Sequence, residues 1–215
     1  MFYDKYLYIC DIIKILNMKI IGKNSLSQYI GYFLLFLFIF FLFQFVYEII
    51  GYAVSYYNYK TNNHILSDFF IIGTDVGWAK NKWTAPMDDL LKFKFYFPFT
   101  KQNMVTGIFN MEWFIDNMIS GAFFTLFFYT SYKVFREISK DTVFNKGAII
   151  WLKRFGWTNI IFTSFMIIHS LTTPKGIGAT LYSAAFFMFL GILILFVVEF
   201  FKKGHQLESE NELTI

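Results

Sequence analysis

The residue types that usually carry out catalysis are few in this chain and lie far apart. His64, His169 and His205 have no second ligand at the spacing of a metal site. The chain also lacks a phosphate-binding P-loop, a zinc-binding His-Glu-x-x-His motif and the Gly-x-Ser-x-Gly turn of serine hydrolases. The sequence therefore predicts a protein that is not an enzyme and that holds no metal or cofactor.

Polar residues within long apolar runs are the stronger candidates for function. They are Gln44, Glu48, His169 and Glu199. Gln44 and Glu48 are four residues apart, so a helix places them on one face. Ionisable residues inside a membrane are candidates for an ion or substrate path, because burying them unpaired is unfavourable. A structural role is the alternative, since Glu48 and Glu199 lie within about two helical turns of a predicted membrane interface.

The apolar runs themselves indicate a membrane protein. Hydrophobic residues make up 56% of the chain and charged residues only 16%, against about 25% charged residues in soluble domains. Stretches without Asp, Glu, Lys or Arg cover 24–47, 117–132, 155–174 and 176–198, and about 20 residues cross a hydrocarbon core as a helix. We therefore predict an all-α membrane protein with four transmembrane helices. They lie near 26–50, 112–135, 154–172 and 179–201.

Residues that favour helix ends support these boundaries. Ser25 and Gln28 have the spacing of a capping box, and Asn110 is a suitable N-cap for the second span. Asp141 or Thr142 would cap the helix that leads into the third span. A tight turn is predicted between the third and fourth spans, at 172–176, because its proline cannot continue a helix.

The basic residues predict that both termini are cytoplasmic. They are concentrated in the N-terminal segment, in the connection between the second and third spans and at the start of the tail. Short cytoplasmic loops are enriched in Lys and Arg, which sets the orientation. Residues 1–22 combine lysines with apolar residues at helical spacing, which predicts an amphipathic cytoplasmic helix on the inner leaflet. A simple cytoplasmic extension of the first span is the alternative.

The connection 51–111 is predicted to form a small β-containing cap outside the cytoplasm. Connections of this length usually have structure of their own. Segment 90–99 alternates lysines with phenylalanines, which is the period of a strand, and segment 67–78 is a second strand candidate. The cap is either a lid over the helix ends or a ligand site.

The C-terminal segment 202–215 is predicted to be a cytoplasmic tail in which apolar residues alternate with glutamates. As a helix it would place Glu208 and Glu212 on one face. As an extended strand it would point its glutamates to one side and its apolar residues to the other. The sequence leaves open a strand added to another edge, a plug under the basic connection and a disordered end.

The last span and the tail also contain charged, glycine and apolar residues in a distinctive order. In order they are Glu199, Lys202, Gly204, Leu207, Glu210, Glu212, Leu213, Thr214 and Ile215. Val143-Phe144, Lys153-Arg154 and Gly156 stand before or at the start of the third span. These features resemble a bacterial four-helix integral membrane family of unknown function. Its members tend to have a Pro-Phe pair where this chain has Val143-Phe144.

The resemblance implies a multi-pass protein of the bacterial inner (cytoplasmic) membrane, in contact with the lipid bilayer, without an established activity. Its members resemble membrane partners of small helix-turn-helix regulators. We therefore expect a regulatory or scaffolding protein that binds a cytoplasmic partner and has no direct contact with nucleic acid. The candidate partner-binding residues are Leu207, Glu210, Glu212, Leu213, Thr214 and Ile215 in the tail, with Lys153 and Arg154 in the connection. The alternative is a small transporter or channel that uses Gln44, Glu48 and His169.

Overall fold

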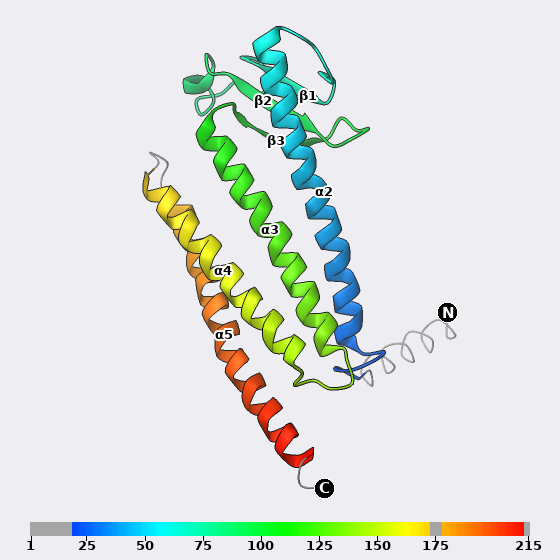
Figure 1. Cartoon of the computed structure of the whole chain (residues 1–215). Helices are drawn as coiled ribbons and strands as arrows, with labels where there is room; N and C mark the ends of the chain where they lie inside the picture. Colours follow the sequence, from blue (N-terminus) through cyan, green and yellow to red (C-terminus); the bar gives the residue numbers. More distant parts are fainter. Residues whose placement is uncertain (1–18, 173–177, 213–215) are drawn as a thin grey trace, which may run out of the picture. The chain divides into compact units, whose positions relative to one another are not determined.

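The computed structural model describes residues 19–172 and 178–212, and Figure 1 shows the order of its elements. In chain order these are α2 (Leu26–Thr61), β1 (Phe70–Gly73), the short 3-10 helix η1 (Ala85–Met87), β2 (Lys92–Tyr96), β3 (Asn103–Ile108), α3 (Met111–Ile138), α4 (Lys146–Thr172) and α5 (Gly178–Glu212). The four predicted helices and the β-containing connection are confirmed. The amphipathic helix predicted at 1–22 and the turn predicted at 172–176 lie almost wholly outside the described residues.

Two of the four helices are long and apolar enough to span a membrane. They are α2 and the Leu181–Glu210 part of α5. Almost none of the apolar window of α2 is buried, so its large side chains face outward, as Phe33 and Phe36 do with 61% and 63% of their surface exposed. The core helix of a soluble protein would bury such residues. The crossings predicted for α3 and α4 stay predictions.

The chain divides into two compact units. One contains the residues up to Ile39 and from Phe124 onward, and the other contains Phe40–Phe123. Helices α2 and α3 each contribute residues to both units. The cap belongs to the second unit, and α4 and α5 belong to the first.

Helix α2 continues well beyond the predicted end of the first span near residue 50. It has 36 residues, which corresponds to roughly 54 Å of helix. Gly51, the first residue beyond the predicted end, lies inside the helix, and aromatic rings occupy the space beside it. Ring atoms of Phe70 and Phe95 lie 2.9 Å from the place where a Cβ on Gly51 would be. The helix therefore ends at Thr61 instead of near residue 50, and the missing side chain of Gly51 leaves room for the two rings.

Helices α2 and α3 begin directly after the predicted capping residues, Ser25 and Asn110. The side-chain oxygen of Asn110 accepts a hydrogen bond from the amide of Trp113 at 2.9 Å, as an N-cap should. At α2 the Gln28 side chain accepts from the amide of Asn24 at 2.8 Å, while the Ser25 hydroxyl donates to the Gly22 carbonyl at 2.5 Å. The helix starts where predicted, with different bonds from those of a capping box.

The predicted caps of α4 were wrong. Asn145 caps this helix, because its side-chain oxygen accepts from the amide of Ala148 at 2.8 Å. Asp141 instead forms an ion pair with Lys23 at 2.9 Å. The hydrogen bond between them raises the pKa of Lys23 and lowers the pKa of Asp141. Both groups are therefore charged at neutral pH, although their exposure to water keeps the contribution of the pair small.

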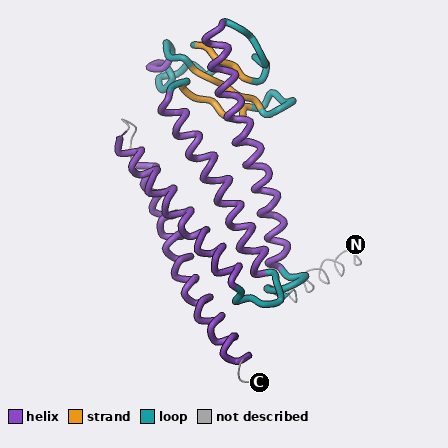
Figure 2. Tube along the Cα trace, viewed as in Figure 1, coloured by secondary structure: helices purple, strands orange, loops and turns teal. Residues whose placement is uncertain are grey.

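The cap contains a three-stranded antiparallel sheet in the order β1-β2-β3. Strands β1 and β2 fall within the two predicted strand segments, whereas β3 was not predicted. Figure 2 shows the sheet in orange beside the C-terminal part of α2. Phe93 pairs with Ile72 on one side and with Gly107 on the other, so β2 is the central strand.

The core of the cap is a cluster of aromatic side chains. Tyr52 of α2 packs with Phe70, Phe93 and Phe95, and each of the four is at most 5% exposed. The ring of Tyr52 lies 4.9 Å from that of Phe93 and 5.3 Å from that of Phe95. The Asn117 amide of α3 donates to the Tyr52 hydroxyl at 2.7 Å, so the buried polar end of this side chain has a partner.

Helices α4 and α5 approach each other closely at two glycines. A Cβ on Gly191 would lie 2.9 Å from the carbonyl oxygen of Gly156, and small residues permit this approach. Nearby, Leu152 of α4 packs with Ile194 and Val198 of α5.

We expect Phe93→Ala to destabilise the cap by about 3–5 kcal/mol, because it removes a fully buried ring. Hydrogen exchange of the β1, β2 and β3 amides in nanodiscs should then become faster than in the parent chain. Phe99→Ala is the matched control, because the Phe99 side chain is 94% exposed. Equal effects of the two substitutions would contradict the assignment of the aromatic cluster as the core.

Candidate functional site

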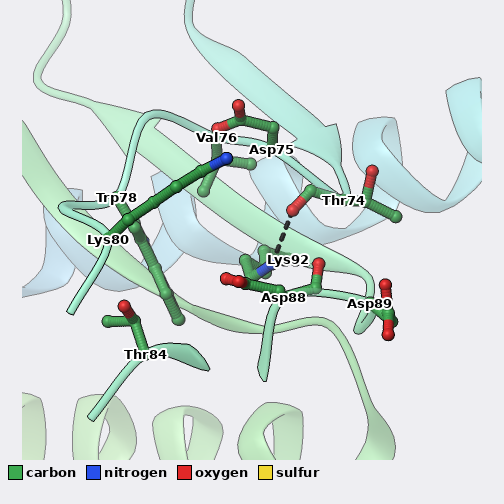
Figure 3. Close-up of a pocket in the computed structure, with 9 residues that line it drawn as sticks. All are labelled: Thr74, Asp75, Val76, Trp78, Lys80, Thr84, Asp88, Asp89 and Lys92. Atoms are coloured by element: carbon green, nitrogen blue, oxygen red, sulfur yellow. Dashed lines mark hydrogen bonds between the residues drawn. The ribbon is translucent and has the colours of Figure 1, made fainter. Parts of the chain in front are cut away.

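The clearest candidate for a ligand site lies in the cap and is organised by Lys92. Side chains alternate along a strand, so Phe93 and Phe95 face the aromatic core while Lys92 and Lys94 face the other way. Lys92 is nevertheless only 4% exposed. Its ammonium donates to the carbonyl of Thr74 at 2.5 Å and to that of Asp88 at 2.9 Å, and Figure 3 draws the first of these bonds. Because a buried charge needs such partners, Lys92 joins the loop after β1 to the segment after η1.

The pocket around Lys92 has a volume of about 270 Å³. Its lining consists of Thr74, Asp75, Val76, Trp78, Lys80, Thr84, Asp88, Asp89 and Lys92. The indole of Trp78 donates to the hydroxyl of Thr106 at 2.8 Å, and this hydroxyl donates to the Phe93 carbonyl at 2.7 Å. The aromatic wall of the pocket is therefore fixed to the central strand.

The lining of this pocket is mostly polar and charged. Three carboxylates and two ammonium groups line it, which suits a small polar molecule that carries both charges. Its lining contains no His or Cys that would act with a neighbouring hydroxyl as base or nucleophile. Within residues 19–172 and 178–212, no group of three or more His, Cys, Asp or Glu is placed to hold a metal ion.

The structure brings together two of the polar residues predicted within the apolar runs. The Gln44 amide donates to the Glu48 carboxylate at 3.1 Å, one turn apart on α2. Glu48 is only 7% exposed, so this bond supplies part of the compensation that a buried carboxylate needs.

His169 and Glu199 lie in the other unit. His169 is partly buried near the end of α4, and its carbonyl accepts a bond from the hydroxyl of Thr172 at 2.8 Å. Glu199 forms an ion pair with Lys202 at 2.6 Å, with 63% of its side-chain surface exposed. The Glu199 carboxylate is therefore partnered within its own helix.

The tail is helical as far as the structure describes it. Helix α5 continues without interruption to Glu212, so the extended alternative does not apply to residues 202–212. Leu207 is 62% exposed, and Glu210 is exposed as well. The predicted partner residues Leu213, Thr214 and Ile215 lie outside the described residues, and the side chain of Glu212 is not described.

One residue of the connection between α3 and α4 packs against the tail. The ring of Phe144 lies 5.3 Å from that of Phe201, and a Cβ on Gly204 would come 2.6 Å from it. The connection and the start of the tail therefore form one surface. The predicted partner residues Lys153 and Arg154 lie elsewhere, beside Trp151 in a groove between α3 and α4.

The sequence did not single out the residues that organise these sites. Lys92 appeared only as part of a strand pattern, and Trp78 only as the last residue of a strand candidate. Trp151 gave no signal, although two cations lie over its ring. The sequence signal that could have indicated Lys92 is the alternation of lysine and phenylalanine along β2. Successive side chains point to opposite faces of a strand, so the lysines must share a face away from the phenylalanines.

These features define a helical protein with two helices that are able to span a membrane and a small three-stranded cap. The chain belongs to the family described as "Protein of unknown function (DUF2975)", which matches residues 102–215, more than half of the chain. The match covers β3, α3, α4 and α5 and leaves out the residues that line the Lys92 pocket. Neither the curated proteins nor the solved structures gave a match.

We expect Lys92→Met to loosen the two segments that the ammonium joins. The carbonyls of Thr74 and Asp88 lose their donor, at a cost of about 1–3 kcal/mol. Hydrogen exchange of the amides in segments 74–78 and 86–90 should become roughly 5- to 150-fold faster. Lys101→Met is the matched control, because Lys101 is exposed and does not line the pocket. Unchanged exchange in the Lys92 variant would show that the two bonds do not hold the pocket together.

Proposed function

We propose that the chain is a non-enzymatic regulatory or scaffolding protein of the bacterial cell membrane. Its cytoplasmic partner would bind the surface formed by the end of α5 and the connection around Phe144. The observation that carries this proposal is the continuity of α5. One helix contains both the apolar run and the acidic tail, so a contact at the tail is mechanically joined to the membrane segment.

The proposed membrane placement has four spans and both termini in the cytoplasm. Helices α3 and α4 have 28 and 27 residues, which gives about 40 Å of helix for each. This length exceeds the hydrocarbon core of about 30 Å. Basic residues from Lys133 to Arg154, at the end of α3, in the connection and in the first turns of α4, support a cytoplasmic location for this end of the helices.

The proposed partner surface begins where the apolar part of α5 ends. The helix has 35 residues and a length of about 52 Å, so roughly 20 Å of it extends beyond a hydrocarbon core. Leu207 offers an apolar contact, and the neighbouring glutamates favour a partner with a basic surface. A helix that presents such side chains would dock in a groove of the partner. The resemblance to membrane partners of helix-turn-helix regulators makes a small regulator of that kind the partner to test first.

Transport is the second candidate function, and the burial of Glu48 favours it. A carboxylate inside a membrane-spanning helix is a typical element of an ion path. The bond from Gln44 also fits a purely structural role. The continuity of the four helices favours regulation, because many transporters bind their substrates at broken helices.

The topology is testable with single cysteines in a Cys10→Ser background. We expect Ala85→Cys to react with a reagent that cannot cross the membrane when it is added to intact cells. Lys5→Cys and His205→Cys should react only after the cells are opened, because both termini are cytoplasmic. Reaction of either terminal cysteine in intact cells would contradict the proposed orientation.

The tail is testable by replacing Glu210–Ile215 with a Gly-Ser segment of the same length. We expect the variant to insert into the membrane as the parent chain does and to lose co-purification of a co-expressed small helix-turn-helix regulator. Gly204→Leu should weaken the same interaction, since the new side chain would displace Phe144. Lys101→Gln, in the cap, is the control and should retain the regulator. A regulator that co-purifies equally with all variants would exclude the tail as its binding surface.

A further inference from the structure

An apolar groove lies between α3 and α4 in the unit that contains Phe124–Ile215. We call it the α3–α4 groove, and its volume is about 630 Å³. Its lining consists of Leu126, Tyr129, Thr130, Ile150, Trp151, Lys153, Arg154, Trp157, Thr158, Ile161 and Phe162. Most of these side chains are apolar or aromatic, and several are widely open to the surroundings. Ile161, for example, is 59% exposed.

One end of the groove is strongly basic. The Arg154 guanidinium lies 4.5 Å from the centre of the Trp151 ring, and the Lys133 ammonium lies 5.4 Å from the same ring. Lys153 lines the groove beside them. The lining contains no acidic residue. Two cations therefore lie over the Trp151 ring and a third lines the groove, which has no carboxylate to neutralise them.

The other end of the groove is apolar and extends along the helices. From the basic end at Arg154 the lining continues along α4 to Phe162, a helical rise of about 12 Å. This is close to the depth of one leaflet, which is half of a hydrocarbon core of about 30 Å. The groove therefore has the length that one acyl chain occupies below its headgroup.

The two threonine hydroxyls of the lining already have hydrogen-bond partners within their own helices. Thr130 donates to the carbonyl of Leu126 at 2.7 Å, and Thr158 donates to that of Arg154 at 2.9 Å. Such bonds to the preceding turn satisfy the hydroxyl within its own helix. Contact with a hydrocarbon chain would therefore break no hydrogen bond of either threonine. The groove wall is compatible with hydrocarbon at these two positions.

We propose that the α3–α4 groove binds an anionic phospholipid. Its phosphate lies at Lys133, Lys153 and Arg154, and one acyl chain follows the apolar wall toward Leu126 and Phe162. Charge complementarity selects an anionic headgroup, while the exposed apolar wall needs a ligand with a hydrocarbon chain. An acidic protein segment would satisfy only the cations. The proposal rests on the proposed crossing of the membrane by α3 and α4.

The test is equilibrium lipid binding to the purified full chain in mild detergent, measured by native mass spectrometry. Phosphatidylglycerol and phosphatidylcholine with the same acyl chains are the two probes, and glycerol phosphate supplies the anion without a chain. We expect tighter binding of phosphatidylglycerol. The double variant Lys153→Gln, Arg154→Gln should bind phosphatidylglycerol about 25-fold more weakly, at about fivefold for each charge. Its binding of phosphatidylcholine should change by less than about twofold.

Lys140→Gln with Lys146→Gln is the matched control. It removes the same charge near the same end of α4, at residues that do not line the groove, and should leave phosphatidylglycerol binding unchanged. Ile161→Trp narrows the apolar wall and should weaken both lipids without a change in charge. Equal losses in the groove and control variants, or equally tight binding of glycerol phosphate, would overturn the proposed site.

Alkaline extraction of the cell membranes separates this inference from the proposed function. If the chain is released, both the membrane placement and the lipid site are refuted. If the chain stays in the membrane and the groove variant binds phosphatidylglycerol as the parent does, only the lipid site is refuted.

Discussion

The cap depends on the burial of one phenol, that of Tyr52. Its ring lies within 5.9 Å of the rings of Phe93, Phe95, Phe109 and Phe114, and its hydroxyl accepts the bond from Asn117. A buried phenol must find a polar partner as well as apolar contacts, so it fixes α2, the sheet and the start of α3 together. The register of β2 follows from this, since Phe93 and Phe95 must face the phenol. Lys92 is then left on the opposite face, where the pocket forms.

The sequence predicted those elements whose signal is local, in composition or in short-range spacing. Charge-free runs located all four helices, because a long apolar helix leaves a mark in composition alone. The start of α3 was also readable, since Asn110 caps it through a local bond. Lysine alternating with phenylalanine located β2, because its two faces meet different surroundings.

The features that the sequence did not predict share one cause: each depends on contacts between residues that are distant in sequence. Helix α2 continues past the predicted end near residue 50, where Phe70 and Phe95 pack beside Gly51. Strand β3 contains Gly107, which is unfavourable in a strand, but the ring of Trp113 occupies the place of its missing side chain. The Lys92 pocket and the α3–α4 groove could not be read from the sequence, since each requires several elements to be placed first.

The continuity of α5 constrains more than the length of the tail. Each residue of an α-helix advances the chain by about 1.5 Å and turns it by about 100°, so the direction in which Leu207 points is set by the part of α5 that packs on α4. The close approach of Gly191 to Gly156 and the contact of Phe144 with Gly204 fix that angle at two levels. A single residue inserted between Phe201 and Leu207 would therefore rotate the end of the helix by about 100° without altering its acidity. The sequence therefore determines the direction in which the tail side chains point around the axis of α5, as well as the composition of the tail.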